Sequence, residues 1–156
     1  MVAPPDAPWV RVVDAEPAMH TTGRPRHDFG HRLPAGRRGP DGVFAAWRLD
    51  GERLVVETDR YGMFPLFFHA DRRQIMVSPS IPQLLALGAP AEIDYDALGV
   101  FLHVGFFLRD ETPFRAIRAL PPGGSIAWAR GALTADGAVP LTPPITIRYD
   151  AAVDAY

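Results

Sequence analysis

Histidines and a carboxylate gather early in the chain, where they could bind a metal ion. His27, Asp28 and His31 lie within five residues, and His20 lies upstream. Histidines at positions i and i+4 share one face of a helix, an arrangement that suits zinc. Gly30 and the nearby prolines argue against a helix here. We therefore expect solvated loop histidines and no metal site.

The candidate nucleophiles are hydroxyl groups, because the 156 residues contain no cysteine. A thiol nucleophile, a thiolate metal site and a disulfide are excluded within them. Thr21 or Thr22 could become an N-terminal nucleophile after self-cleavage behind His20, but nothing flanking them indicates such processing. Three serines are considered as nucleophiles, but none has an evident partner histidine and acid: Ser78, Ser80 and Ser125. Ser80 stands at a helix start, where a serine usually acts as a cap.

A local basic stretch could contact phosphate groups, an acidic protein surface or solvent alone. It consists of Arg24, Arg26, Arg32, Arg37 and Arg38. Phe29 is the one phenylalanine, tyrosine or tryptophan between them, and the formal net charge of the chain is -2, so nucleic acid is not an expected partner. A contact with a partner protein and a plain solvated arm stay open as alternatives.

Length and composition indicate one domain, with 47% apolar and 22% charged residues. The start has no basic segment followed by an apolar one, and no apolar run approaches membrane-spanning length. We expect a cytoplasmic protein that makes no membrane contact.

A clear secondary-structure pattern, which would position these residues, begins at residue 42. Runs at 43–49 and 53–58 flank Asp50 and Gly51, a dipeptide typical of a type I′ hairpin turn. A second pair of strands is predicted at 64–69 and 74–78, with both faces covered because polar residues do not alternate along them.

The first 41 residues show little periodicity, apart from a run at 9–13 that could be a short strand. Proline, glycine and arginine are frequent there, so we expect an irregular arm over 1–41. Further strands are predicted at 125–129 and 145–149.

Two packing helices are predicted, over 81–87 and 95–104. Ser80 and Asp94 precede them as caps, and glycines follow them. In the second helix, the spacing of a buried face is shown by Leu98, Phe101 and Leu102. The fold class is therefore α+β, with antiparallel β-sheets and packed helices.

Aromatic residues are expected mainly in the core, and some could form an interface: Trp47, Phe64, Phe67, Phe68, Phe101, Phe106, Phe107 and Trp128. Phe106, Phe107 and Leu108 follow the end of the second helix in a loop-like context. An exposed apolar patch there would mark a docking surface.

Four segments in order resemble the asparagine synthetase family: 42–47 (GVFAAW), 59–68 (DRYGMFPLFF), 98–106 (LGVFLHVGF) and 112–123 (TPFRAIRALPPG). The chain is similar, over roughly 42–128, to the second half of that family's N-terminal class II glutamine amidotransferase domain. The resemblance implies a reduced version of the αββα sandwich of N-terminal-nucleophile (Ntn) hydrolases over 42–149. Residues 150–156 would be a tail or the start of a linker.

The resemblance transfers scaffold positions and no catalytic group: Asp59, Arg60, Gly62, Pro65, Leu66 and Ser78. Asp59 and Arg60 are charges inside an apolar stretch, so we expect them to be paired or to cap the turn. Pro79 departs from the family's glutamate. Residues 38–41 spell the family's R-G-P-D loop, but they adjoin the next strand directly, so we interpret them as a coincidence.

In the resembled family an N-terminal cysteine attacks the glutamine amide, and its own α-amino group acts as the base. Met1 and Val2 offer no such nucleophile, and the family's oxyanion and substrate-binding segments are missing. The resemblance thus implies a domain without glutaminase activity and without a cofactor.

Relatives that lack the nucleophile, such as β-lactam synthetases and lasso-peptide cyclases, keep this domain beside an ATP-dependent, amide-forming synthetase domain. We therefore expect a scaffold or adaptor whose partner is a synthetase, in cis or in trans. An independent small-molecule or peptide-binding module, and an amidohydrolase with an unrecognised nucleophile, stay open as alternatives.

Overall fold

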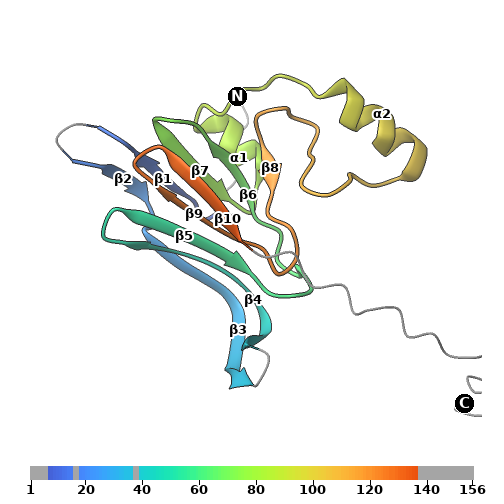
Figure 1. Ribbon diagram of the computed structural model, residues 1–156. Helices are drawn as coiled ribbons and strands as arrows, with labels where there is room; N and C mark the ends of the chain where they lie inside the picture. The colour runs from blue at the N-terminus through green and yellow to red at the C-terminus, as the bar shows by residue number, and fades with distance from the viewer. Residues whose placement is uncertain (1–6, 16–17, 37–38, 137–156) are drawn as a thin grey trace, which may run out of the picture.

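A computed structural model of the chain describes residues 7–15, 18–36 and 39–136. Its strands form two five-stranded sheets that lie face to face, with the orders β2-β1-β7-β6-β8 and β10-β9-β5-β4-β3 (Figure 1). All strand pairs in these sheets are antiparallel. The elements are β1 (Val10–Val13), β2 (His20–Gly23), β3 (Arg26–Gly36), β4 (Gly39–Asp50), β5 (Arg53–Thr58), β6 (Phe67–Ala70), β7 (Gln74–Ser78), α1 (Ile81–Ala86), α2 (Tyr95–Val104), β8 (Arg118–Ala119), β9 (Ser125–Ala129) and β10 (Ala132–Asp136).

The main core lies between the two sheets, where alternate residues of each strand point inward. Trp47 of β4 and Trp128 of β9 are among its fully buried side chains, and β7 of the opposite sheet contributes Val77. Each buried indole N–H has an acceptor: Trp47 Nε1 donates to the Arg24 carbonyl at 2.8 Å, and Trp128 Nε1 to the Asp71 carbonyl at 3.2 Å. Since Asp71 follows β6, Trp128 connects the two sheets.

The predicted hairpin between β4 and β5 is present, but its turn is shifted by one residue. Asp50 pairs with Arg53, so the two-residue loop consists of Gly51 and Glu52. Of these two, only Gly51 has a positive φ, at 57°. A positive φ at the first loop residue alone is the pattern of a type II′ turn, so the predicted type I′ turn at Asp50 and Gly51 was wrong.

Both predicted helices are present, and each begins after its predicted cap. Ser80 Oγ accepts a hydrogen bond from Gln83 N at 3.3 Å, and Asp94 Oδ1 accepts one from Ala97 N at 3.2 Å. Gly105 ends α2 in the left-handed conformation. Helix α1 covers the outer face of the first sheet through a second apolar cluster, whose buried members are Met76, Leu84, Ala89 and Ile117.

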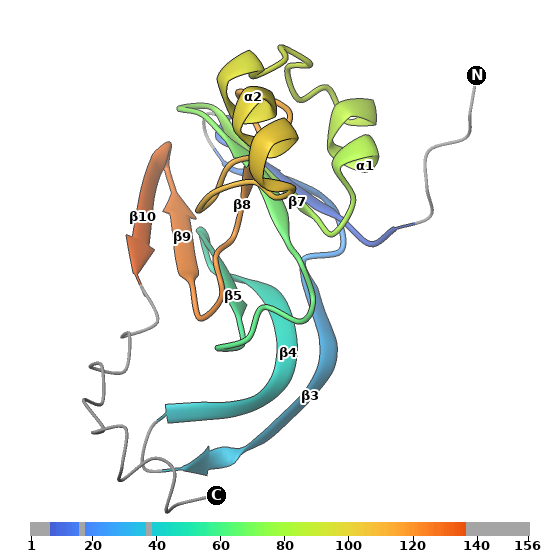
Figure 2. The ribbon, with the colours of Figure 1, turned by 90° about the vertical axis from the view of Figure 1, so that its right-hand side faces the viewer.

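Helix α2 does not bury the face that its spacing predicted. Ala97 is its one buried residue, whereas Phe101 is 37% exposed and Leu102 is 81% exposed. Figure 2 shows α2 at one end of the molecule, beside the loop that leads into β8. Apolar spacing marks a face of the helix, but the rest of the fold decides whether that face meets a sheet.

The irregular arm expected over residues 1–41 was wrong for the part that the structure describes. β1 confirms the strand suggested at 9–13, and it pairs with β7. β2 extends the first sheet and β3 pairs with β4 along the edge of the second. An edge strand takes its conformation from its hydrogen-bonded neighbour, so its own sequence can hide it.

The α+β class with antiparallel sheets is confirmed. β7 and β9 have their predicted limits, whereas β6 begins three residues later than predicted, at Phe67. The expected domain boundary at residue 42 falls inside β4. The strand predicted at 145–149 and the segment 150–156 lie outside the described residues. Across the described ranges, no helix has the length and apolar character needed to span a bilayer.

Candidate functional site

A buried carboxylate holds the turn that follows β5. Asp59 is 3% exposed. Its Oδ1 accepts hydrogen bonds from Tyr61 N at 2.7 Å and Gly62 N at 3.1 Å, and its Oδ2 accepts one from Phe44 N at 3.0 Å. These bonds agree with the expectation that Asp59 caps the turn. They also compensate the desolvation of the carboxylate, whose two oxygens are occupied by backbone N–H groups.

The same turn is joined to the loop that precedes β9. Thr58 Oγ1 donates to the Pro121 carbonyl at 2.9 Å. Gly62 has a φ of 62°, and a Cβ at this position would lie 2.9 Å from Pro122 Cγ. Both the backbone conformation and the close contact with the proline therefore favour glycine at position 62.

The other residues carried over by the resemblance surround this turn or end a strand. Leu66 is buried in the main core, and Pro65 is exposed just before β6. The Arg60 guanidinium lies 5.2 Å from the centroid of the neighbouring tyrosine ring. Ser78 is fully buried at the end of β7, where its Oγ donates to the Pro8 carbonyl at 3.2 Å. These contacts are structural in kind.

Several hydroxyl groups in the described residues bond to the backbone. Thr112 Oγ1, for example, donates to the Ile117 carbonyl at 2.7 Å. Thr21 and Thr22 lie within β2, paired with β1. Within the described ranges, no serine or threonine hydroxyl is hydrogen-bonded to a histidine, aspartate or glutamate side chain. The arrangement in which a neighbouring base activates a hydroxyl is thus not formed there.

The early histidines lie on strands and not in the predicted loop. His27 and His31 are on β3, and Asp28 takes the opposite face of that strand. His20 is on β2, in the other sheet. In the part of the chain that the structure describes, no three potential ligands come together as a metal site would require.

His27 belongs instead to an aromatic cluster at the edge of the core. Its ring centroid lies 4.4 Å from that of Phe29 and 5.2 Å from that of Trp47. Burial lowers the pKa of His27 below its usual value, and the charge of Arg24 lowers it further, while Asp28 opposes this shift. The neutral imidazole is therefore the form that this packing favours.

The basic stretch is divided among different surroundings. Arg32 and Arg48 both bond to Glu57 Oε1, at 2.7 and 2.9 Å, on the outer face of the second sheet. Arg26 pairs with Asp28 at 3.2 Å. Residues 37 and 38 lie outside the described part. Pairing with carboxylates reduces the positive charge available to a phosphate-bearing partner.

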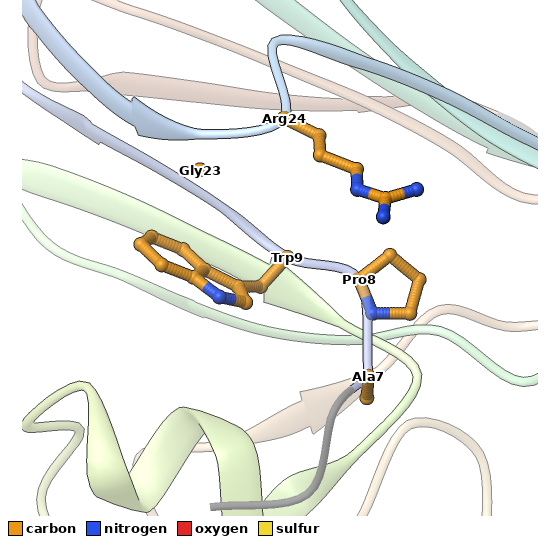
Figure 3. Close-up of a pocket in the computed structure, with 5 residues that line it drawn as sticks. All are labelled: Ala7, Pro8, Trp9, Gly23 and Arg24. Atoms are coloured by element: carbon orange, nitrogen blue, oxygen red, sulfur yellow. The ribbon is translucent and has the colours of Figure 1, made fainter.

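Arg24 lines a pocket of about 240 Å³ beside the start of β1, which the sequence did not reveal. The other lining residues are Ala7, Pro8, Trp9 and Gly23 (Figure 3). Figure 3 shows the Arg24 guanidinium extending over Pro8, with the Trp9 indole on the other side of the β1 backbone. The pairing of β1 with β2 brings these segments together, so only long-range contacts create the pocket.

A buried histidine on β6 also escaped the sequence analysis. His69 Nδ1 lies 2.8 Å from the Ala116 carbonyl oxygen, and Nε2 lies 3.5 Å from Asp71 Oδ2. Burial raises the pKa of Asp71, but the N–H groups of Arg73 and Gln74, together with His69, outweigh this effect and lower it overall. His69 thus links β6, the β6–β7 turn and the loop before β8.

The residues proposed as an interface differ in exposure. Phe106 is 59% exposed and Leu108 is 43% exposed. Phe107 stacks on Phe101 of α2, with ring centroids 4.7 Å apart. Phe106 and Leu108 are therefore the exposed apolar residues of this segment, whereas Phe107 is half-buried against α2.

A comparison with protein families identifies a glutamine amidotransferase-like domain in this chain. The family model described as "Glutamine amidotransferase domain" matches residues 37–137. The chain therefore belongs to this family. The matched segment spans β4 to β10 and includes the Asp59 turn and α2. A search of curated proteins found no match.

Proposed function

We propose that this chain is a glutamine amidotransferase-like domain without glutaminase activity, which acts as a scaffold for an ATP-dependent, amide-forming synthetase. Its membership of the asparagine synthetase family is part of the proposal. One observation carries it: the 156 residues contain no cysteine, and no described serine or threonine hydroxyl is hydrogen-bonded to a histidine, aspartate or glutamate side chain. The Asp59 turn keeps its hydrogen bonds, so the fold can persist without glutaminase activity.

The fold fits a reduced αββα sandwich of Ntn hydrolases. Two antiparallel sheets face one another, and α1 covers the outer face of the first sheet. On the described outer face of the second sheet, a charged group formed by Arg32, Arg48 and Glu57 occupies the surface. Relative to a complete αββα sandwich, the layer that is reduced in this proposal is therefore the helical layer over the second sheet.

The partner synthetase, in cis or in trans, would dock on the surface formed by Phe106 and Leu108. Exposed apolar surface of this kind is typical of protein contacts. A cytoplasmic location belongs to the same proposal, since it provides ATP. No cofactor is needed for a scaffold.

A glutaminase assay on the purified chain tests the loss of activity. We expect no ammonia release from glutamine above the protein-free rate, even at high protein concentration. Release that scales with protein concentration, and that disappears in Thr21→Ala or Thr22→Ala, would favour an amidohydrolase with an unrecognised nucleophile.

Binding to the synthetase encoded in the same or the neighbouring reading frame tests the scaffold role. Phe106→Ser and Leu108→Ser should each weaken this binding by about tenfold or more, since each removes an apolar contact. Leu133→Ser is the matched control, because Leu133 is 44% exposed on β10. Equal effects of all three changes would contradict the docking surface.

The pocket of Trp9 and Arg24 favours a second candidate function, a small binding module. Its volume of about 240 Å³ lies just below the usual range for ligand pockets, and the Arg24 guanidinium suits a small carboxylate. Small carboxylates should then raise the melting temperature of the chain, and Arg24→Ala should abolish the increase. No increase across a carboxylate panel would rule this function out.

A further inference from the structure

The backbone around Arg24 is fixed where it lines the pocket beside the start of β1. Arg24 N donates to the Trp9 carbonyl at 2.8 Å, and the Arg24 carbonyl accepts a hydrogen bond from Trp47 Nε1 at 2.8 Å. Gly23 has a φ of 83°, and a Cβ there would lie 2.6 Å from Trp9 Cε3. These bonds and this close packing hold the pocket wall in place, so a ligand would meet a preformed surface.

The Arg24 guanidinium differs from its neighbours in the basic stretch by its lack of a carboxylate partner. Arg26 pairs with Asp28, and Arg32 pairs with Glu57. Among the residues that the structure describes, no carboxylate lies within ion-pair distance of Arg24. Figure 3 shows the guanidinium at the pocket. Both oxygens of a small carboxylate can therefore bind to it.

His27 and Arg24 are held against the same tryptophan. The His27 ring centroid lies 5.2 Å from that of Trp47, and Trp47 Nε1 donates to the Arg24 carbonyl. In the pairing of β3 with β4, Trp47 is also the partner of His27. The fully buried Trp47 therefore fixes the backbones of these two residues relative to one another.

Two charged groups act on the His27 imidazole. Burial lowers the pKa of His27 most, the charge of Arg24 lowers it further, and Asp28 raises it. On β4 the residue opposite His27 is the uncharged Trp47, and Arg48 lies on the other face of that strand. The field of a carboxylate bound to Arg24 opposes the field of the guanidinium. Occupancy of the pocket therefore favours the protonated imidazole.

We propose that the Arg24 pocket binds a small carboxylate cooperatively with a proton on His27. This inference rests on the second candidate function, the small binding module, and adds the regulation of that site. The proton comes from solvent when the carboxylate binds and returns to solvent when it leaves. Binding therefore strengthens as the pH falls through the titration of His27.

One factor describes both sides of this coupling, because linkage between two ligands is reciprocal. The attraction between two unit charges near a protein surface is weakened by solvent and salt. We therefore expect the carboxylate to bind about two- to fivefold more tightly when His27 is protonated. Saturation of the pocket should raise the midpoint of the His27 titration by the logarithm of the same factor.

An NMR titration of the full chain with acetate, at constant ionic strength, tests the coupling. The ring C–H signals of His27 report its protonation, and the backbone N–H signals of Trp9 and Arg24 report occupancy of the pocket. Acetate should bind more tightly at about pH 5.5 than at about pH 7.5, a range in which its carboxyl group is largely ionised. Acetamide has nearly the same shape without the charge, so it should neither bind nor move the His27 titration.

Three variants separate the two groups. Arg24→Gln should abolish acetate binding and, without acetate, raise the midpoint of the His27 titration, because a positive charge that disfavours the imidazolium is removed. His27→Gln should still bind acetate, with an affinity that no longer changes with pH. Arg53→Gln is the matched control, since Arg53 is an exposed arginine on β5, and it should change neither measurement.

The outcomes distinguish the coupling from the binding module itself. Acetate that binds equally at both pH values, and leaves the His27 titration in place, would overturn the coupling and keep the binding module. A pH dependence that persists in His27→Gln would assign the proton to another group and overturn the coupling as well. No acetate binding at either pH would overturn both. The measurement on the unaltered chain decides between these outcomes even if a variant does not fold.

Discussion

Replacing Asp59 should destabilise the whole domain, because its carboxylate satisfies three buried or half-buried N–H groups. Asp59→Asn has nearly the same shape but only one acceptor oxygen. If that oxygen faces Tyr61 and Gly62, the new amide N–H points at Phe44 N. If the amide is flipped, the turn loses both of its bonds. One side of the carboxylate is left unsatisfied in either orientation.

The expected loss follows from the bonds that disappear. A hydrogen bond to a charged group contributes about 1.5–3 kcal/mol, and a buried donor left unsatisfied costs about 1–3 kcal/mol. We expect Asp59→Asn to lower the free energy of unfolding by about 2–4 kcal/mol, and Asp59→Ala by about 3–5 kcal/mol. Domains of this size have a free energy of unfolding of about 5–15 kcal/mol, so the alanine variant should be close to unfolding.

Urea unfolding followed by tryptophan fluorescence measures this loss, because Trp47 and Trp128 are fully buried in the core. Asp28→Asn is the control: the Asp28 side chain is 49% exposed and its pair with Arg26 should contribute less than about 1 kcal/mol. The reasoning is refuted if Asp59→Asn costs no more than this control. Amide hydrogen exchange should also show faster exchange at Phe44 N in the Asp59 variants.

Three further results are expected. Gly62→Ala should lower the free energy of unfolding by about 1–3 kcal/mol, since it adds a contact with Pro122 to the strain of a positive φ. Gly51 has a similar φ, but a Cβ there would meet nothing within 4 Å, so Gly51→Ala is the control. If Gly51→Ala lowers the free energy of unfolding as much as Gly62→Ala does, the contact with Pro122 costs nothing. His27 has a lowered pKa in the folded state, so its contribution to stability is present above the usual histidine pKa near 6.5 and is lost as the pH falls through the lowered value. His27→Phe should therefore flatten the dependence of stability on pH between about 7 and 5, and an unchanged slope in urea titrations would assign that dependence to other groups. Phe106→Ser should reduce the fluorescence of a dye that binds exposed apolar surface, without lowering the melting temperature by more than a few degrees; a large drop in that temperature would mean that Phe106 is part of the core.

Short-range signals explain what could be predicted from the sequence. Helices α1 and α2 begin where Ser80 and Asp94 stand, because a side-chain oxygen satisfies the first free N–H groups of each helix. β7 and β9 have the predicted limits, since apolar runs bounded by turn residues define them. The turn of Asp59 was legible for the same reason, as a charge in an apolar stretch needs local donors.

Strands and surfaces that depend on distant residues could not be predicted in this way. β3 looks irregular as a sequence, but it pairs with β4 over most of its length. The pocket at Trp9 and Arg24, and the bonds of His69, likewise join segments that are far apart along the chain. The residues next to each of these positions do not predict such long-range contacts.

The sequence by itself determined the helix caps, the hairpins, the Asp59 turn and the lack of a thiol nucleophile, because each depends on residue type or on neighbours within a few positions. Only the tertiary structure decided that β2 and β3 extend the two sheets and that α2 keeps Tyr95 and Leu102 exposed. The physical reason is that pairing and burial are properties of the opposite surface. Whether an apolar face is core or interface depends on what the rest of the chain places against it.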